Sequence, residues 1–222
     1  MSKISLEPNV SGAGTFTLAA PNSNTNRTLT LPDESGTIFS DGTGVSGSAV
    51  TGQLASSNMP AGSMIQVVSA TKTNTFSATL SSAGEESGTV TGLTASITPS
   101  SASSKVLVRV FVNLGVEGHA LAGVAIILFR DSTKIGIGAD TSSTQVSSAG
   151  YNADSEDRII TNVGFEIEDD PSSTSETTYS IKLVRQTGGS TPFTFYVNRA
   201  QDTGTDARFS TASTITAMEI AG

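Results

Sequence analysis

The most regular pattern of apolar and polar positions along the chain lies between residues 105 and 131. From Val106 to Leu114, every second residue is Val or Leu, which matches the side-chain period of a β-strand. The segment Leu121–Phe129 is apolar almost without interruption, and its β-branched residues and flanking glycines favour a second strand over a helix. Both strands carry apolar side chains on both faces. We therefore expect one face to pack inside a two-sheet sandwich and the other to meet an identical subunit.

Shorter alternating runs, bounded by Gly, Pro, Asp or Ser, predict further strands. After residue 62 these are Met64–Ala70, Phe76–Leu80, Leu93–Thr98, Thr133–Ile137, Arg158–Ile167, Thr177–Arg185, Phe193–Asn198 and Ser213–Ile220. The polar stretch Gly138–Asp157 is expected to be a surface loop. The last strand has no strongly polar face apart from Glu219, so we place it inside a sheet rather than at an edge. Together these strands predict an antiparallel jelly-roll sandwich over residues 62–222.

The first part of the chain has far fewer apolar residues than the part after residue 62. Its short alternating strands are Phe16–Ala19, Arg27–Leu31 and Thr37–Phe39. They are too short and too few to bury a core by themselves, so we interpret residues 1–40 as a β segment that pairs with other chains or docks on a larger body. Residues 41–61 are rich in Gly, Ser and Thr and predict a linker or a short neck. A short helical turn at Val50–Ser57 is an alternative within it.

Composition excludes several classes of function. The chain has a net charge of −8, and its 12 Lys and Arg residues are scattered, which argues against nucleic acids and anionic membranes as partners. The absence of Cys removes disulfides and thiolate metal sites. No apolar run approaches the roughly 20 residues that span a bilayer, and no signal peptide is recognisable. We expect a soluble protein without membrane insertion that gains toughness by oligomerising.

The charged residues offer little catalytic chemistry. His119, the only histidine, lies in a Gly-flanked turn and is interpreted as a turn residue rather than as part of a triad. Carboxylates gather at Asp154, Glu156, Asp157, Glu166, Glu168, Asp169 and Asp170. The run Glu166–Asp170 would suit a hard cation such as Ca²⁺, but it lacks the ordered spacing of an EF-hand loop. We interpret it as a solvated acidic loop and expect no cofactor.

Two stretches resemble the tail-fibre and receptor-binding proteins of tailed bacteriophages. They are Asn26–Ile38 (NRTLTLPDESGTI) and Tyr196–Ile220 (YVNRAQDTGTDARFSTASTITAMEI). The resemblance implies a homotrimer whose C-terminal domains are TNF-like or C1q-like jelly rolls around a threefold axis. It also implies that the N-terminal part attaches to other virion proteins through Arg27, Thr28, Leu29, Thr30, Leu31 and Pro32. Because only residues 41–61 separate the two parts, the resemblance implies a short or cap-like fibre.

Aromatic residues near the ends of the predicted strands are candidates for the trimer axis. Phe193, Phe195 and Val197 share one strand face, which is interpreted as sandwich core. Tyr196 lies on the opposite face, and we expect Tyr196, Phe111 and Met218 at the trimer interface. An ion on the threefold axis stays an open alternative.

The predicted function is that of a virion structural protein, a short trimeric tail fibre that binds a host surface receptor. A glycan is one candidate receptor, bound by Ser, Thr and Asn side chains of the tip loops. A glycan-cutting fibre is disfavoured, because the chain has no Trp, no β-helix repeat and only Tyr151, Tyr179 and Tyr196 as tyrosines. The main alternative is a head fibre, capsid decoration or baseplate adaptor protein. A cellular C1q-like lectin is least favoured, since it leaves the N-terminal motif without a purpose.

Overall fold

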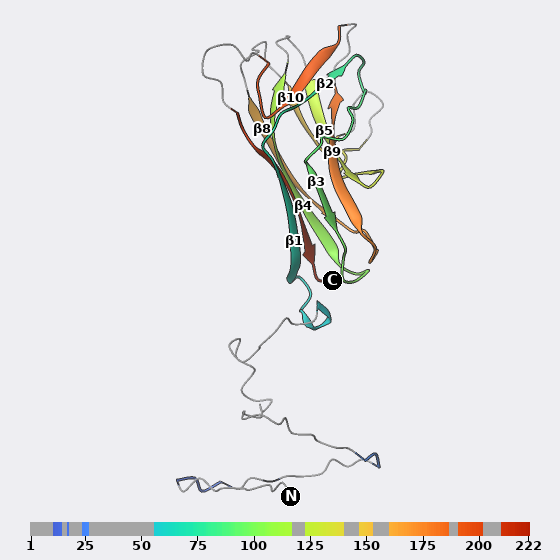
Figure 1. The fold of residues 1–222 in the computed structure, drawn as a ribbon. Coiled ribbons are helices and arrows are strands. Elements are labelled where there is room, and N and C mark those ends of the chain that lie inside the picture. The colour runs from blue at the N-terminus through green and yellow to red at the C-terminus, as the bar shows by residue number, and fades with distance from the viewer. Residues whose placement is uncertain are drawn as a thin grey trace, which may run out of the picture. The chain divides into compact units, whose positions relative to one another are not determined.

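The computed structural model describes residues 11–14, 17, 24–26, 56–116, 123–139, 147–152, 160–186, 191–201 and 210–222. The chain divides into two units, Met1–Val50 and Thr51–Gly222. The second unit holds an all-β sandwich (Figure 1). The predicted strands Arg27–Leu31 and Thr37–Phe39, and with them the proposed attachment residues, lie outside the described residues. Of the predicted strand Phe16–Ala19, only Thr17 is described.

The described strands agree closely with the alternation in the sequence. They are β1 (Met64–Lys72), β2 (Phe76–Leu80), β3 (Thr94–Ile97), β4 (Lys105–Val116), β5 (Gly123–Arg130), β6 (Thr133–Ile135), β7 (Ala149–Asn152), β8 (Thr161–Asp169), β9 (Thr177–Arg185), β10 (Phe193–Val197) and β11 (Ser213–Ile220). A single-turn 3-10 helix, η2 (Ser56–Asn58), precedes β1 within the predicted neck.

The first sheet, sheet A, is organised around β4. One edge of β4 pairs with β8 between residues 106 and 114. The other edge pairs with β11 along residues 105–111 and with β10 along residues 114–116. Strands β10 and β11 therefore lie end to end in one row, and β1 and β2 pair with them from outside. The prediction that the last strand, β11, lies inside a sheet is confirmed, because it runs between β1 and β4.

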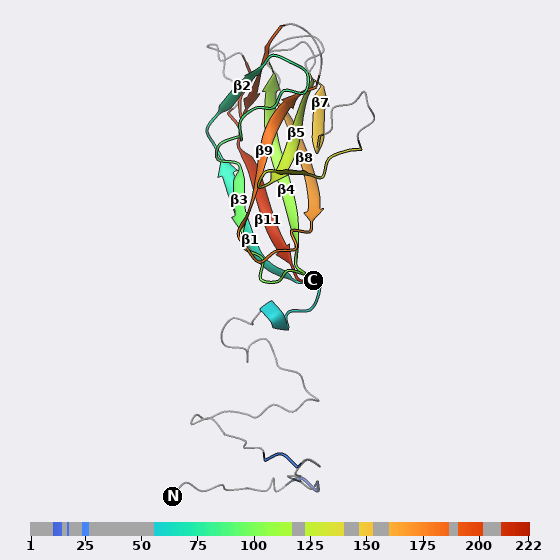
Figure 2. The ribbon, with the colours of Figure 1, turned by 90° about the vertical axis from the view of Figure 1, so that its right-hand side faces the viewer.

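The second sheet, sheet B, has the order β3, β9, β5, with β6 and β7 both on the far edge of β5. All these pairings are antiparallel. The chain crosses from one sheet to the other at most steps, which is the winding of a jelly roll. Figure 2 looks onto sheet B with sheet A behind it, and shows the C-terminus at the same end of this unit as η2. The predicted all-β antiparallel sandwich is confirmed.

The inward faces of the two sheets form one apolar core. Every second residue of β4 from Val106 to Leu114 is at most 1% exposed, as the alternation in the sequence predicts. Burying each such side chain contributes about 1.5–3 kcal/mol. The predicted core residues Phe193, Phe195 and Val197 belong to the same cluster, so that interpretation is confirmed. The strand that carries them, β10, lies at the end of the sandwich opposite η2 (Figure 1).

The outward face of β5 corrects one expectation. Its residues Ala125, Ile127 and Phe129 form a second buried cluster with Val184 of β9, and each is at most 5% exposed in the single chain. The ammonium group of Lys182 lies 4.4 Å from the centre of the Phe129 ring. This face is already covered within the chain. The expectation that the apolar outer face of β5 needs a second subunit is therefore wrong.

Two segments predicted as loops are strands. β7 lies inside the stretch Gly138–Asp157, which the sequence predicts to be a surface loop, and it completes the edge of β5. β8 continues to Asp169, so Glu166, Glu168 and Asp169 belong to a strand and not to a solvated loop. The cause is non-local, because the cationic side chains that pair with Glu166 and Glu168 lie on the neighbouring strand β4.

A buried asparagine joins the rows of sheet A where β10 ends. Asn198 is fully buried, has a φ of 65°, and its side-chain amide donates hydrogen bonds to the carbonyls of Lys72 (2.8 Å) and Asn74 (3.0 Å). Its side-chain oxygen accepts a hydrogen bond from the Ser213 hydroxyl (2.6 Å), which in turn accepts one from the backbone N–H of Asn113 (3.0 Å). The residue therefore connects β1, β4, β10 and β11 where the strand rows break.

Replacing Asn198 tests this joint. We expect Asn198→Gly to lower the free energy of unfolding by about 2–4 kcal/mol, because two buried carbonyls lose their donors. Asn198→Ala should cost about 1 kcal/mol more, since an alanine resists positive φ while glycine does not. Urea denaturation measures both values. Ser96→Ala, which removes an exposed hydroxyl pair with Thr178, is the control and should change stability little. Equal losses of stability for the glycine and alanine variants would show that the positive φ at residue 198 does not contribute to the cost.

Candidate functional site

The face of sheet A that points away from the core carries most of the exposed large apolar side chains. In the described part of the chain these side chains are Met64, Val67, Phe111 and Ile137, and the first three lie on β1 and β4. We call the outward side chains of β1, β11, β4 and β8 the A face. Its members include Val67, Leu107, Arg109, Phe111, Glu166, Glu168, Thr214, Thr216 and Met218.

The register of the strands builds an apolar row across the A face. Met218 of β11 lies opposite Val67 of β1 on one side and opposite Leu107 of β4 on the other. Val67 is 52% exposed, whereas Met218 between its two neighbours is 7% exposed. Side chains at directly opposed positions in an antiparallel sheet touch each other. The row is therefore continuous over three strands and open to solvent at β1.

Phe111 lies against the backbone of β8 on the same face. It is opposite Gly164 in register, and a Cβ atom placed on Gly164 would lie 2.7 Å from two carbon atoms of the Phe111 ring. A glycine inside a strand often marks such a close approach. The ring is 44% exposed, so the chain holds an aromatic side chain in place without covering it.

Charged residues run beside these apolar residues in two lines of opposite sign. The cations of Lys105 and Arg109 stand on β4, and the anions of Glu168 and Glu166 stand on β8. Arg109 is opposite Glu166 in register, whereas Glu168 is opposite Leu107 and reaches Lys105 diagonally. The pairs are Lys105–Glu168 at 2.8 Å and Arg109–Glu166 at 2.6 Å, and all four side chains are substantially exposed. The hydrogen bond from Lys105 to Glu168 raises the pKa of the lysine. Exposed ion pairs contribute little to folding stability, so these charges are free to serve a contact with another molecule.

The structure places the three predicted interface residues on one side of sheet A but leaves only one accessible. Tyr196 pairs in register with Gly115 and lies under the guanidinium group of Arg199, 4.2 Å from the ring centre. It is 8% exposed, while Phe111 is 44% exposed and Met218 is 7% exposed. The backbone of Arg199 also lies directly on Gly115. The upper part of this side is therefore covered by the chain itself. Sequence reasoning missed Val67, although the alternation of β1 was visible.

The acidic run does not converge on a cation site. Asp169 points into the sandwich, where its carboxylate accepts hydrogen bonds from Arg130 at 2.9 Å and from the Tyr179 hydroxyl at 2.7 Å. Burial, followed by the bond to Asp169, raises the pKa of Tyr179. Asp170 instead accepts a hydrogen bond from the hydroxyl of Ser172. Within the described residues, no group of three or more His, Asp or Glu side chains is placed to hold a metal ion.

Several other candidates lie outside the described residues, namely His119, Asp154, Glu156 and Asp157. Tyr151 lies in β7. Among the described residues, no helix has the length and apolar character that crossing a membrane requires. Compared with known proteins, the chain matches no family model and is not significantly similar to any curated protein.

A buried carboxylate closes the sandwich at the end where the neck enters. Glu219 of β11 is fully buried, and its Oε1 atom accepts hydrogen bonds from the backbone N–H and the hydroxyl of Ser100, both at 2.7 Å. Its Oε2 atom accepts one from the side-chain amide of Gln66 at 2.6 Å. Burial by itself would raise the pKa of Glu219, but the hydrogen bonds from Ser100 and Gln66 outweigh it and lower the pKa.

This arrangement predicts an acid-sensitive contribution to stability. A carboxyl group whose pKa is lower in the folded protein stabilises the fold above its unfolded pKa and loses that effect as the pH falls through the folded pKa. We expect Glu219→Gln to lower the free energy of unfolding by about 2–3 kcal/mol at pH 7, because hydrogen bonds to a charged group are lost. The deficit relative to wild type should shrink as the pH falls below the ordinary value of 4.5.

Denaturation curves recorded between pH 7 and pH 3 measure this effect. Glu176→Gln, which changes an exposed glutamate, is the matched control and should alter stability little at any of these pH values. A deficit for Glu219→Gln that stays constant over the whole range would show that the charge of Glu219 does not stabilise the fold.

Proposed function

We propose that this protein is a structural protein of a bacteriophage particle, a short homotrimeric tail fibre. Residues 1–40 attach it to other virion proteins, and the C-terminal sandwich contacts the host cell surface. The observation that carries the proposal is a jelly roll with exposed apolar side chains gathered on one sheet, the A face. The fibre-like motifs Asn26–Ile38 and Tyr196–Ile220 at the two ends of the chain supply the connection to phage fibres.

The two ends of the sandwich differ, which supports attachment at one end and receptor contact at the other. The backbone N–H of Gly62 donates to the carbonyl of Ala221, and the N–H of Ala221 donates to the carbonyl of Ser63, each at 2.8 Å. The neck therefore enters the sandwich beside the end of β11. The opposite end carries β2 and β10 and the turn that follows β2 (Figure 1). That end is the one proposed to meet the host.

The A face supports self-association in a ring. Val67 and Phe111 offer apolar area, and the lines of opposite charge on β4 and β8 allow a cation of one copy to meet an anion of the next. Repeated head-to-tail contacts of this kind close into a cyclic oligomer when the rotation fits. Three weak receptor sites on one rigid trimer then bind a repetitive surface with a large gain in effective concentration.

The mass in solution tests the trimer. We expect light scattering to give a mass close to three times the 22.6 kDa of one chain, stable on dilution. Phe111→Asp should shift the protein to monomers, because it places a charge at the centre of the A face. Ile137→Asp is the matched control, since Ile137 is 40% exposed but follows β6 of sheet B, and this variant should stay trimeric.

A monomeric wild type, or equal dissociation of both aspartate variants, would contradict the role of the A face. The thermal stability of Phe111→Asp should fall no further than the loss of the trimer explains, because Phe111 is not part of the core.

Competition for adsorption tests the receptor-binding role. The purified full chain, added to host cells before the phage, should slow adsorption at saturating concentration. The Phe111→Asp monomer should need a concentration higher by about two orders of magnitude, because it lacks the gain from three linked sites. Adsorption rate constants measure both effects. No competition at saturation, together with binding to isolated capsids or baseplates, would support a head-fibre, decoration or adaptor protein instead. Release of reducing ends from host polysaccharide would support a glycan-degrading fibre.

A further inference from the structure

The ion pairs of the A face lie between its apolar side chains. Along β4, the outward positions are Lys105, Leu107, Arg109 and Phe111, so charged and apolar side chains alternate. The register places Arg109 and its partner Glu166 between Phe111 and the apolar row that contains Leu107. A partner that covers both Phe111 and the apolar row must therefore also cover the Arg109–Glu166 pair.

Both ion pairs are in contact with water in the single chain and lose that contact when A faces meet. The side chains of Lys105, Arg109, Glu166 and Glu168 are each at least 40% exposed. An exposed ion pair adds little to stability, because water and salt screen it. At an interface that excludes water, by contrast, a charge without a partner of opposite sign is costly. The charge balance of the A face therefore affects whether copies associate.

The A face has no net charge at neutral pH. Among the described residues it carries two cations, Lys105 and Arg109, and two anions, Glu166 and Glu168. The outward side chains of the other two strands are uncharged; they are Val67, Ser69 and Thr71 on β1 and Thr214, Thr216, Met218 and Ile220 on β11. Protonation of the two glutamates would consequently leave a face that carries only positive charge.

Two further charged groups border the A face. Asp170 follows β8 and interacts electrostatically with Lys105. At the other border, the guanidinium group of Arg199 lies over the ring of Tyr196. Acid removes the negative charge of Asp170 and leaves the positive charge of Arg199, so both groups change the balance in the same direction as the two glutamates.

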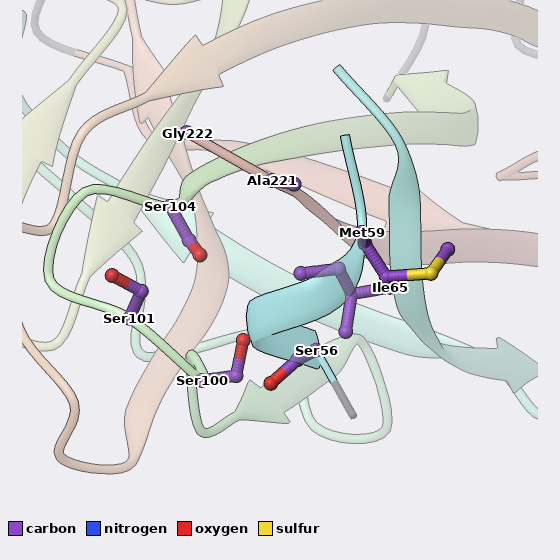
Figure 3. Close-up of a pocket in the computed structure, with 8 residues that line it drawn as sticks. All are labelled: Ser56, Met59, Ile65, Ser100, Ser101, Ser104, Ala221 and Gly222. Carbon is purple, nitrogen blue, oxygen red and sulfur yellow. The ribbon is translucent and has the colours of Figure 1, made fainter. Parts of the chain in front are cut away.

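The buried carboxylates nearby do not face the A face. Asp169 points into the sandwich and pairs with Arg130. Glu219 points inward to Ser100, which lines a pocket at the neck end of the sandwich (Figure 3). Both groups affect the stability of the single chain, and neither is placed to contact a second copy across sheet A.

We propose that the A face is an acid-sensitive switch of assembly, which lets copies associate while Glu166 and Glu168 are charged and separates them when both are protonated. The inference rests on the proposed homotrimer. Glutamate side chains ordinarily take up protons at about pH 4, whereas lysine and arginine keep their charge there. Three copies with two unpaired cations each, Lys105 and Arg109, then bring six like charges together around one axis. Like charges at an interface oppose association.

The mass of the full chain at several pH values tests the switch. Light scattering is recorded over a dilution series between pH 7 and about pH 3.5, at low salt and in about 0.5 M sodium chloride. We expect a trimer at pH 7, and a concentration for half-dissociation at least about tenfold higher at the lowest pH. The added salt should remove most of this difference, because it screens the repulsion. Circular dichroism shows whether the sandwich is still folded at each pH, since Glu219 makes the fold itself acid-sensitive.

Two double variants should change the pH profile in different ways. Lys105→Gln with Arg109→Gln leaves only carboxylates on the A face, so association should be weaker at pH 7 and tighter in acid, the reverse of wild type. Glu166→Gln with Glu168→Gln leaves only cations, so association should be weak over the whole range and nearly independent of pH. None of these four residues belongs to the core. Glu176→Gln, which changes an exposed glutamate outside the A face, is the matched control and should follow wild type.

The outcomes separate the switch from the trimer on which it depends. A folded wild type that is equally tight at both ends of the pH range would overturn the switch and leave the trimer standing. So would a Lys105→Gln and Arg109→Gln variant whose association weakens in acid as that of wild type does. A wild type that is monomeric at pH 7 would overturn both.

Discussion

One edge of the long strand β4 is too long for a single partner, so two strands share it. The arrangement of the rest of sheet A depends on this division. β11 pairs with its first part and β10 with its last part, so the chain must leave the row after Val197 and return at Ser213. Asn198 supplies the hydrogen bonds at the break. The chain that leaves the row then lies on Gly115, and Arg199 covers Tyr196. The segment that leaves the row after β10 therefore covers the outer surface of sheet A around Gly115 and Tyr196. Phe111, four residues before Gly115 on β4, stays exposed.

The buried charged side chains of the sandwich lie at the ends of its strands. Between the sheets the side chains are apolar, and the buried charges sit where strands begin or end. Asp169 meets Arg130 and Tyr179 at one corner, and Glu219 meets Ser100 at the neck end. At the other end, Arg185 lies under carbonyl oxygens and against the ring of Phe193. Each charge has several hydrogen bonds, which is the condition under which a buried charge is tolerated. The apolar core drives the two sheets together, and these directional contacts determine how the sheets are positioned on each other.

Much of the fold was predictable because alternation is a local signal. Phe76–Leu80, Thr177–Arg185 and Ser213–Ile220 were predicted with the bounds that the structure has. β7 was missed because the sequence AGYN has no alternation, and its pairing with β5 provides its order. The predicted strand Arg158–Ile167 stops two residues short of the end of β8, because the partners of Glu168 and Asp169 on β4 lie about 60 residues earlier in the chain. The A face was predictable in part. Phe111 and Met218 follow from alternation, but the apolar row through Val67 requires the register between β1 and β11.

The two outer surfaces of the sandwich differ in what a partner would have to displace. On sheet B the apolar cluster around Phe129 lies beneath Lys182, and Glu86 forms ion pairs with both Lys134 and Lys182. The hydrogen bond from Lys134 lowers the pKa of Glu86, which favours the charged form of this carboxylate. A partner on that side would have to bury a charged network to reach apolar area that is already covered, and burying charges is costly. On the A face the apolar side chains are directly accessible, and the exposed ion pairs beside them can exchange partners between copies without burying an unpaired charge. Association through sheet A therefore gains apolar burial at a smaller electrostatic cost than association through sheet B.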